Sequence, residues 1–227
     1  MIFMKYWMRF LEGILKKRTS SQGEELMDEN LDKIVFQKQQ LGLPIKMHLG
    51  CGTLYKEGWI NIDNNSENNI EKLDFNWDLS KDLPLVGSGV DFVYHEHFIE
   101  HLTYGQGQSF LKNILRLLKK GGVMRIACPD LDSIVEGYVK DNWRQQDWVT
   151  TYNCQWIKSR GEMINTCLNM QPWSHAYVYN KEDLVGALVE AGFSLENIYE
   201  VKFSESNYED LKNLETRKDS LILEVEK

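Results

Sequence analysis

Short apolar runs along the chain alternate with stretches in which apolar residues recur at helical spacing. The short runs predict strands, because buried strands are apolar segments of about four to eight residues between turn signals. They cover residues 45–49, 59–63, 90–94, 123–128, 198–203 and 221–225. Helical spacing predicts helices at 24–41, 106–119 and 181–191, and Gly121-Gly122 indicates the end of the second one. This alternation predicts βαβ units and therefore an α/β fold with a mostly parallel sheet.

The N-terminal residues predict a helix with a narrow polar stripe. Its charged positions are Lys5, Arg9, Glu12 and Lys16. We expect the helix at residues 2–18 to pack on the domain or on a second subunit; the alternative is an amphipathic helix in a membrane interface. A polar linker follows at 19–24. We therefore expect an N-terminal helical extension at 1–41 and a main domain at 42–227.

Composition narrows the classes of partner. The 227 residues carry a net charge of −8, whereas proteins that bind nucleic acid usually present a basic face, so we expect no nucleic-acid partner. Charged residues interrupt the apolar stretch at 1–18, and no run approaches the roughly 18 apolar residues of a membrane span. The four cysteines show no zinc-binding spacing. We therefore expect reduced thiols and a cytoplasmic location. Peripheral membrane contact through residues 2–18 is an option.

A glycine pair follows the first strand, and an acid ends the second. Gly50 and Gly52 allow the backbone to approach a ligand closely. Asp63, at the end of strand 59–63, offers a carboxylate that can accept both hydroxyl hydrogens of a ribose. A Rossmann dehydrogenase is the competing interpretation, but it requires a third glycine where Tyr55 stands. The pattern favours a nucleoside-containing ligand without a pyrophosphate.

The order of these motifs resembles that of a known family. Residues 48–53 (His-Leu-Gly-Cys-Gly-Thr) resemble the glycine-rich first motif of class I S-adenosylmethionine-dependent methyltransferases. Asp63 falls where that family binds the ribose, and Asp78-Leu79 resembles the motif whose acid faces the adenine amino group. Residues 83–95 resemble the fourth strand of the family, and residues 100–102 and 115–122 resemble the helix and turn after it. His175 ahead of 184–193 resembles a feature of one sugar-pathway branch.

The resemblance implies a Rossmann-like methyltransferase fold with an antiparallel C-terminal strand, and S-adenosyl-L-methionine as the cofactor. The cofactor-binding residues that it implies are His48, Gly50, Cys51, Gly52, Asp63, Asn64, Asp78, Leu79 and His95. The sequence departs from the family at His48, which replaces an acid, and at Leu54, which replaces a third glycine. Only 13 positions separate Gly50 from Asp63, so the first crossover is expected to hold a helical stub or an irregular loop. A compact branch that is often encoded with polysaccharide enzymes has this short connection.

Histidines near residue 100 suggest two kinds of chemistry. His97-x-x-Glu100-His101 matches the zinc-binding pattern of inverzincins, in which two histidines share one face of a helix. That zinc hydrolase is an alternative, although the pattern begins at the end of a strand. In the favoured scheme His101 or His175 acts as general base on an acceptor hydroxyl, and no metal is required. A non-catalytic S-adenosylmethionine-binding module is the third option.

An insert at about 130–178 is rich in aromatic residues. They are Tyr138, Trp143, Trp148, Tyr152, Trp156, Trp173 and Tyr177. Aromatic residues at helical spacing are typical of a core, but flat faces with polar tips also suit a lid over a sugar ring. Arg144, Lys158 and Arg160 are candidates to meet an anionic group on the acceptor. The expected acceptor is a hydroxyl of a sugar or sugar-linked metabolite, as in polysaccharide biosynthesis, a preference that rests on the resemblance.

Overall fold

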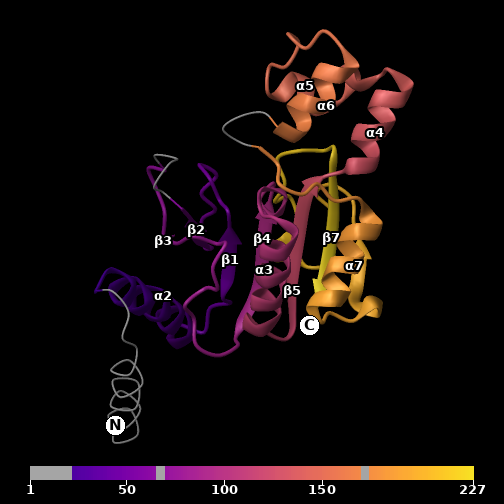
Figure 1. Ribbon diagram of the computed structural model, residues 1–227. Helices are drawn as coiled ribbons and strands as arrows, with labels where there is room; N and C mark the ends of the chain where they lie inside the picture. The colour runs from indigo at the N-terminus through magenta and orange to yellow at the C-terminus, as the bar shows by residue number, and fades with distance from the viewer. Residues whose placement is uncertain (1–21, 65–69, 170–173) are drawn as a thin grey trace, which may run out of the picture.

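A computed structural model describes residues 22–64, 70–169 and 174–227 and has one seven-stranded sheet at its centre (Figure 1). The strands are β1 (Lys46–Leu49), β2 (Ile60–Asp63), β3 (Phe75–Asn76), β4 (Val90–Glu96), β5 (Leu118–Pro129), β6 (Ile198–Glu200) and β7 (Ser220–Glu226). Their order is β3-β2-β1-β4-β5-β7-β6. The first five are parallel, and β7 runs antiparallel to both of its neighbours. The predicted fold, a mostly parallel sheet with an antiparallel C-terminal strand, is confirmed.

The α-helices are α2 (Gln22–Gln40), α3 (Tyr104–Leu117), α4 (Leu131–Lys140), α5 (Asp147–Thr151), α6 (Arg160–Asn169) and α7 (Lys181–Ala191). Short 3-10 helices are η1 (Ile99–His101), η2 (Trp143–Gln145), η3 (Leu195–Asn197) and η4 (Glu209–Leu211). Helices α3, α4 and α7 begin at residues whose side chains cap the first turn. Helix α3 starts with a capping box between Thr103 and Gln106. Helix α7 has the predicted bounds and is capped by Gly192, whose φ of 111° suits a glycine.

Some predicted boundaries were wrong. Helix α3 ends at Leu117, and Gly121-Gly122 lie inside β5 rather than at the end of the helix. The reason is close packing, because a Cβ at residue 122 would stand 2.7 Å from the carbonyl oxygen of Val90 on β4. The strand predicted at 198–203 ends at Glu200, and β4 continues two residues further than predicted, to Glu96. Strand β3 has two residues, too few to carry a hydrophobic pattern.

The two faces of the sheet are covered differently. Helices α2, α3 and α7 cover one face, and Figure 1 shows α3 and α7 lying along it. Buried side chains of that face include Leu31, Met47, Val93, Leu111 and Leu188. The irregular segment 201–219 covers the other face around Trp59, Tyr94, Val123 and Leu211. There the buried Arg125 pairs with Glu215 and Glu224, so this face is held by charge as well as by apolar contact.

The order of the strands reverses at β1. From β1 the chain moves outward through β2 to β3, whereas β4 returns to the other side of β1 and leads to β5. Ligands of open α/β sheets bind outside the carboxyl ends of the strands at such a reversal. The connection from β1 to β2 contains turns and no helix, which confirms the short crossover predicted from the spacing of Gly50 and Asp63.

Helices α4, α5 and α6 form a separate layer above the carboxyl ends of the strands (Figure 1). Their own core includes Trp143 and Trp148, which are 0% and 8% exposed, whereas Trp156 is 56% exposed. Two of the predicted aromatic residues are thus core residues, and Trp173 lies outside the described residues. The chain segments that lead into and out of this layer lie side by side, because the backbone N–H of Leu131 donates to the carbonyl of Tyr179 (2.9 Å).

The helix predicted at 2–18 and most of the linker at 19–24 lie outside the described residues. Helix α2 contributes Leu31 and Val35 to the main core, and the division at residue 41 stays a prediction. Within the described ranges, no helix combines the length and apolar character that crossing a membrane would require.

Candidate active site

The glycine loop after β1 is tied to the end of β2. Gly50 and Gly52 have φ angles of 64° and 52°, a region that favours glycine. The N–H of Gly52 donates to Oδ2 of Asp63 (2.7 Å), and the N–H of Asn64 donates to its Oδ1 (2.6 Å). Burial raises the pKa of Asp63, and these two N–H groups oppose the shift. The loop and the acid predicted from the sequence therefore form one unit.

A cluster of aromatic rings lies against this loop, with Phe98 partly buried and His95 and Phe110 buried. A Cβ at residue 50 would stand 2.5 Å from the ring of Phe98. His95, at the carboxyl end of β4, makes edge contacts with the rings of Phe98 and Phe110. It is 0% exposed, and neither of its ring nitrogens has a hydrogen-bond partner. Burial lowers the pKa of His95 to about 4, so its imidazole is neutral at pH 7.

His48 lies on the opposite face of the sheet from the neighbouring Met47 and Leu49. Its ring stacks on Tyr94 with centroids 5.2 Å apart, and its Nδ1 is 3.1 Å from Oδ1 of Asn61. Burial lowers the pKa of His48 to about 3. These contacts give His48 a role in packing; its predicted contact with a cofactor stays a prediction.

The remaining predicted cofactor residues have mixed surroundings. Oδ1 of Asp78 accepts hydrogen bonds from the N–H (3.0 Å) and hydroxyl (2.6 Å) of Ser80, which lower the pKa of Asp78. Leu79 is buried in the main core, and Asn64 is exposed. Burial raises the pKa of the Cys51 thiol to about 12, so it is protonated at pH 7. Contact of Asp78, Leu79, Asn64 and Cys51 with a cofactor stays a prediction.

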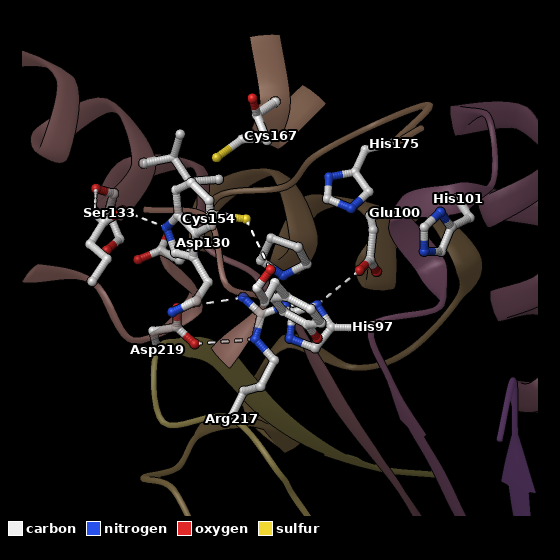
Figure 2. A pocket seen from close by; sticks show the side chains of 16 residues that line it. His97, Glu100, His101, Asp130, Ser133, Cys154, Cys167, His175, Arg217 and Asp219 are labelled. Carbon is white, nitrogen blue, oxygen red and sulfur yellow. Dashed lines mark hydrogen bonds and ion pairs between the residues drawn. The ribbon is translucent and has the colours of Figure 1, made fainter. Parts of the chain in front are cut away.

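A cavity of about 300 Å³ lies between the carboxyl edge of the sheet and the helical layer (Figure 2). Its lining comes from three parts of the chain, represented by Glu100, Trp148 and Arg217. Arg217 pairs with Asp219 (3.3 Å). Both residues were missed in the sequence, because they lie in the irregular segment before β7 and carry no motif. The basic residues that were candidates to meet an anionic acceptor do not line the cavity. Arg144 stacks on Trp143, Arg160 lies over Tyr138, and Lys158 is exposed.

Three side chains contact the ring nitrogens of His97. Its Nδ1 is 3.0 Å from Oε1 of Glu100 and 3.3 Å from Nη1 of Arg217, and its Nε2 is 2.9 Å from the hydroxyl of Ser220. His97 has a φ of 50°, and η1 after it spans three residues. His97 and His101 therefore do not share the face of one α-helix, as the inverzincin pattern requires.

The two predicted catalytic histidines are neighbours. The ring centroids of His101 and His175 are 5.2 Å apart, and both residues line the cavity. The carbonyl of Glu100 accepts from the N–H groups of Ala176 (2.7 Å) and Tyr177 (3.1 Å), so the chain that returns from the helical layer is fixed against η1. Burial opposes ionisation of Glu100, but hydrogen bonding to His97 and the nearby His101 outweigh it and lower the pKa of the carboxyl group.

Comparison with known proteins supports the fold. No protein-family model matches the sequence, and no curated protein is significantly similar to it. A S-adenosylmethionine-dependent methyltransferase from Archaeoglobus fulgidus superposes with a TM-score of 0.51 and 16% identity, over 91% of this chain and 100% of that one. A S-adenosylmethionine-dependent methyltransferase from Thermotoga maritima, described as a possible histamine N-methyltransferase, gives a TM-score of 0.50 and 17% identity over 89% and 92% of the two chains.

A candidate O-methyltransferase from Nostoc punctiforme is 12% identical with a TM-score of 0.46 over 90% of this chain. This chain spans only 57% of the length of that protein. The two fuller matches define the class of fold: the chain has the Rossmann-like fold of class I S-adenosylmethionine-dependent methyltransferases, as the motif order indicated.

Proposed function

We propose that this chain transfers a methyl group from S-adenosyl-L-methionine to a small-molecule acceptor, at a hydroxyl of a sugar or sugar-linked metabolite. The observation that carries the proposal is the junction at the carboxyl edge of the sheet. The glycine loop and Asp63 lie on one side of it, and His101 and His175 line the cavity on the other.

The residues on the loop side fit the cofactor. Space is open beside Gly52, where an added Cβ would meet no heavy atom within 4 Å. The carboxylate of Asp63 suits the two ribose hydroxyls. His95 carries two buried nitrogens without partners, which suits a polar end of a ligand, since buried polar groups are rarely left unpaired. We assign the adenosine to Asp63 and its neighbours Asn64 and Asp78, and the amino-acid end to the loop and His95.

When bound, S-adenosylmethionine supplies a methyl group already activated by its sulfonium, so transfer to a hydroxyl leaves S-adenosylhomocysteine and one proton to remove. The protein contributes mainly alignment of the two reactants. In this proposal the acceptor occupies the cavity beneath the helical layer, and His101 and His175 face its reacting hydroxyl. A neutral imidazole there can take the proton; burial lowers the pKa of His175 and keeps it in that state.

Titration of the metal-free protein with S-adenosylhomocysteine in a calorimeter tests the proposal. We expect saturable binding at one site and a rise in the midpoint of thermal unfolding. A screen of sugar and sugar-phosphate acceptors, read by release of S-adenosylhomocysteine, then tests the acceptor class. No heat and no thermal shift would refute cofactor binding, whereas binding without turnover on any acceptor would favour the non-catalytic module.

A further inference from the structure

Glu100, His101 and His175 form a cluster of ligand atoms at the edge of the cavity. One carboxylate oxygen and one imidazole nitrogen from each histidine lie within 4.8 Å of one another. Figure 2 shows the three side chains directed toward one another. Within the ranges that the structure describes, this is the one group of three or more histidine, cysteine or acidic side chains close enough to share a metal ion.

Two atoms in this cluster are buried without a hydrogen-bond partner. They are Oε2 of Glu100 and Nδ1 of His175. Glu100 is 0% exposed, and its other oxygen, Oε1, is already bonded to His97. A buried carboxylate oxygen and a buried imidazole nitrogen that both lack a partner within one cluster are unfavourable unless a cation or a hydrogen-bonding group satisfies them.

The surroundings of the cluster orient its members in the manner of a metal site. His101 Nδ1 is 3.3 Å from the carbonyl oxygen of Ser174 and donates to it, which leaves Nε2 free to accept. Imidazoles that bind metals typically donate their other N–H to a carbonyl or carboxylate, and ligating carboxylates are themselves hydrogen-bonded. Here His97 is the residue that bonds to the ligating carboxylate, through Oε1 of Glu100.

From this geometry we infer that Glu100, His101 and His175 bind one divalent transition-metal ion, Zn²⁺ or Mn²⁺. Two imidazoles and one carboxylate with an open position are a ligand set of catalytic zinc sites. Ligands about 2.1 Å from one ion stand about 3.4 Å from one another, so side-chain rotation within the cluster must close the present separations. This trio differs from the inverzincin pattern, in which His97 was the first ligand.

The ion would present its open position to the cavity, which His101 and His175 line. The use of the ion rests on the proposed function: an acceptor hydroxyl bound at that position becomes more acidic. In the metal-bound protein the two imidazoles are ligands, and the hydroxyl proton passes to solvent in the cavity. Binding of the ion itself does not depend on the proposed function.

Metal content and affinity test the inference without any acceptor. The full chain, stripped with a chelator, is titrated with Zn²⁺ or Mn²⁺ in a calorimeter, and the bound metal is counted by elemental analysis after dialysis. We expect one ion per chain in the wild type. Affinity should fall at least about 100-fold in His101→Ala and in His175→Ala, and the more conservative His175→Asn guards against a folding defect.

Cys154 and Cys167 line the same cavity and could capture zinc adventitiously, so the matched control is the double variant Cys154→Ser/Cys167→Ser. Retained binding in this variant, with loss in the histidine variants, supports the inference. Binding that follows the cysteines, or wild-type binding no stronger than that of His101→Ala/His175→Ala, overturns it. Titration of the same metal-free samples with S-adenosylhomocysteine reports separately on the proposed function.

Discussion

The glycine-loop side and the cavity side of the site are built in different ways. Gly50, Gly52 and Asp63 come from one short stretch of chain: the N–H of Gly52 donates to the carboxylate of Asp63, and the N–H of Gly50 donates to the carbonyl of Ile62 (2.9 Å). The cavity side is assembled from segments far apart in the sequence, with Glu100, His175 and Arg217 as representatives. The loop side is therefore set by local geometry, and the cavity side by tertiary packing.

This difference implies that the two sides can unfold independently of each other. The helical layer has its own core around Trp143, whereas the loop side shares the main core of the sheet through Leu49 and Ile62. Elements with separate cores can open independently. Substitutions on each side should therefore have distinguishable effects on folding and on cofactor affinity.

Trp143→Ala should have the largest effect on stability. Trp143 is 0% exposed, and removing a buried tryptophan costs about 3–5 kcal/mol. We expect the helical layer to loosen in urea while affinity for S-adenosylhomocysteine is kept, measured by denaturation and calorimetry. Trp156→Ala, on the surface, is the control and should change stability by no more than about 0.5 kcal/mol. Loss of cofactor affinity in folded Trp143→Ala would show that the two sides act as one unit.

Gly50→Ala should be the most costly change on the loop side, at about 3 kcal/mol from a left-handed φ and from overpacking. The new Cβ would collide with the ring of Phe98. Gly52→Ala has a similar φ but open space, and should cost about 1 kcal/mol. Urea denaturation measures both. Adding Phe98→Ala should reduce the penalty at residue 50 and leave that at residue 52 unchanged; equal penalties for the two glycines would contradict the packing argument.

Asp63→Ala should weaken binding of S-adenosylhomocysteine about 100-fold, because hydrogen bonds to a charged group contribute about 1.5–3 kcal/mol. Asp78→Ala is the comparison, since that side chain is 42% exposed and a hydrogen bond open to water contributes less, so about tenfold or less is expected. Calorimetric titration measures both. Wild-type affinity in Asp63→Ala would remove the ribose assignment and leave the fold assignment intact.

His48→Gln should change how stability depends on pH. The buried imidazole has a pKa of about 3 in the folded protein, against about 6.5 when unfolded. Its contribution is therefore intact above pH 6.5 and is lost as the pH falls from there to about 3, at up to about 1.4 kcal/mol per pH unit. Urea midpoints across this range should fall less steeply in the variant. Parallel curves would show that His48 is not protonated on unfolding.

Local signals in the sequence predicted the loop side well. The glycine pair, the acid after β2 and the short crossover each depend on residues near one another in the chain, and the fold places them as expected. The cofactor contacts of individual residues, including His48 and Asp78, stay predictions.

The cavity side could be predicted only in part. His101 and His175 were chosen one by one, but their pairing depends on Ala176 donating to the carbonyl of Glu100, a long-range contact with no sequence pattern. Arg217 lies in an irregular segment, where neither helical nor strand periodicity marks a residue as facing a cavity. Burial of Gly122 against β4 likewise depends on the neighbouring strand, which is why the end of α3 was misplaced.

The hydrogen bond between Leu131 and Tyr179 closes the base of the helical layer and has an evolutionary consequence. The closure entropy of a loop rises only slowly with its length, so segments joined at such a base can be lengthened, shortened or exchanged without repacking the sheet. If the acceptor binds beneath this layer as proposed, exchange of this one segment changes the acceptor while the glycine loop and Asp63 stay the same.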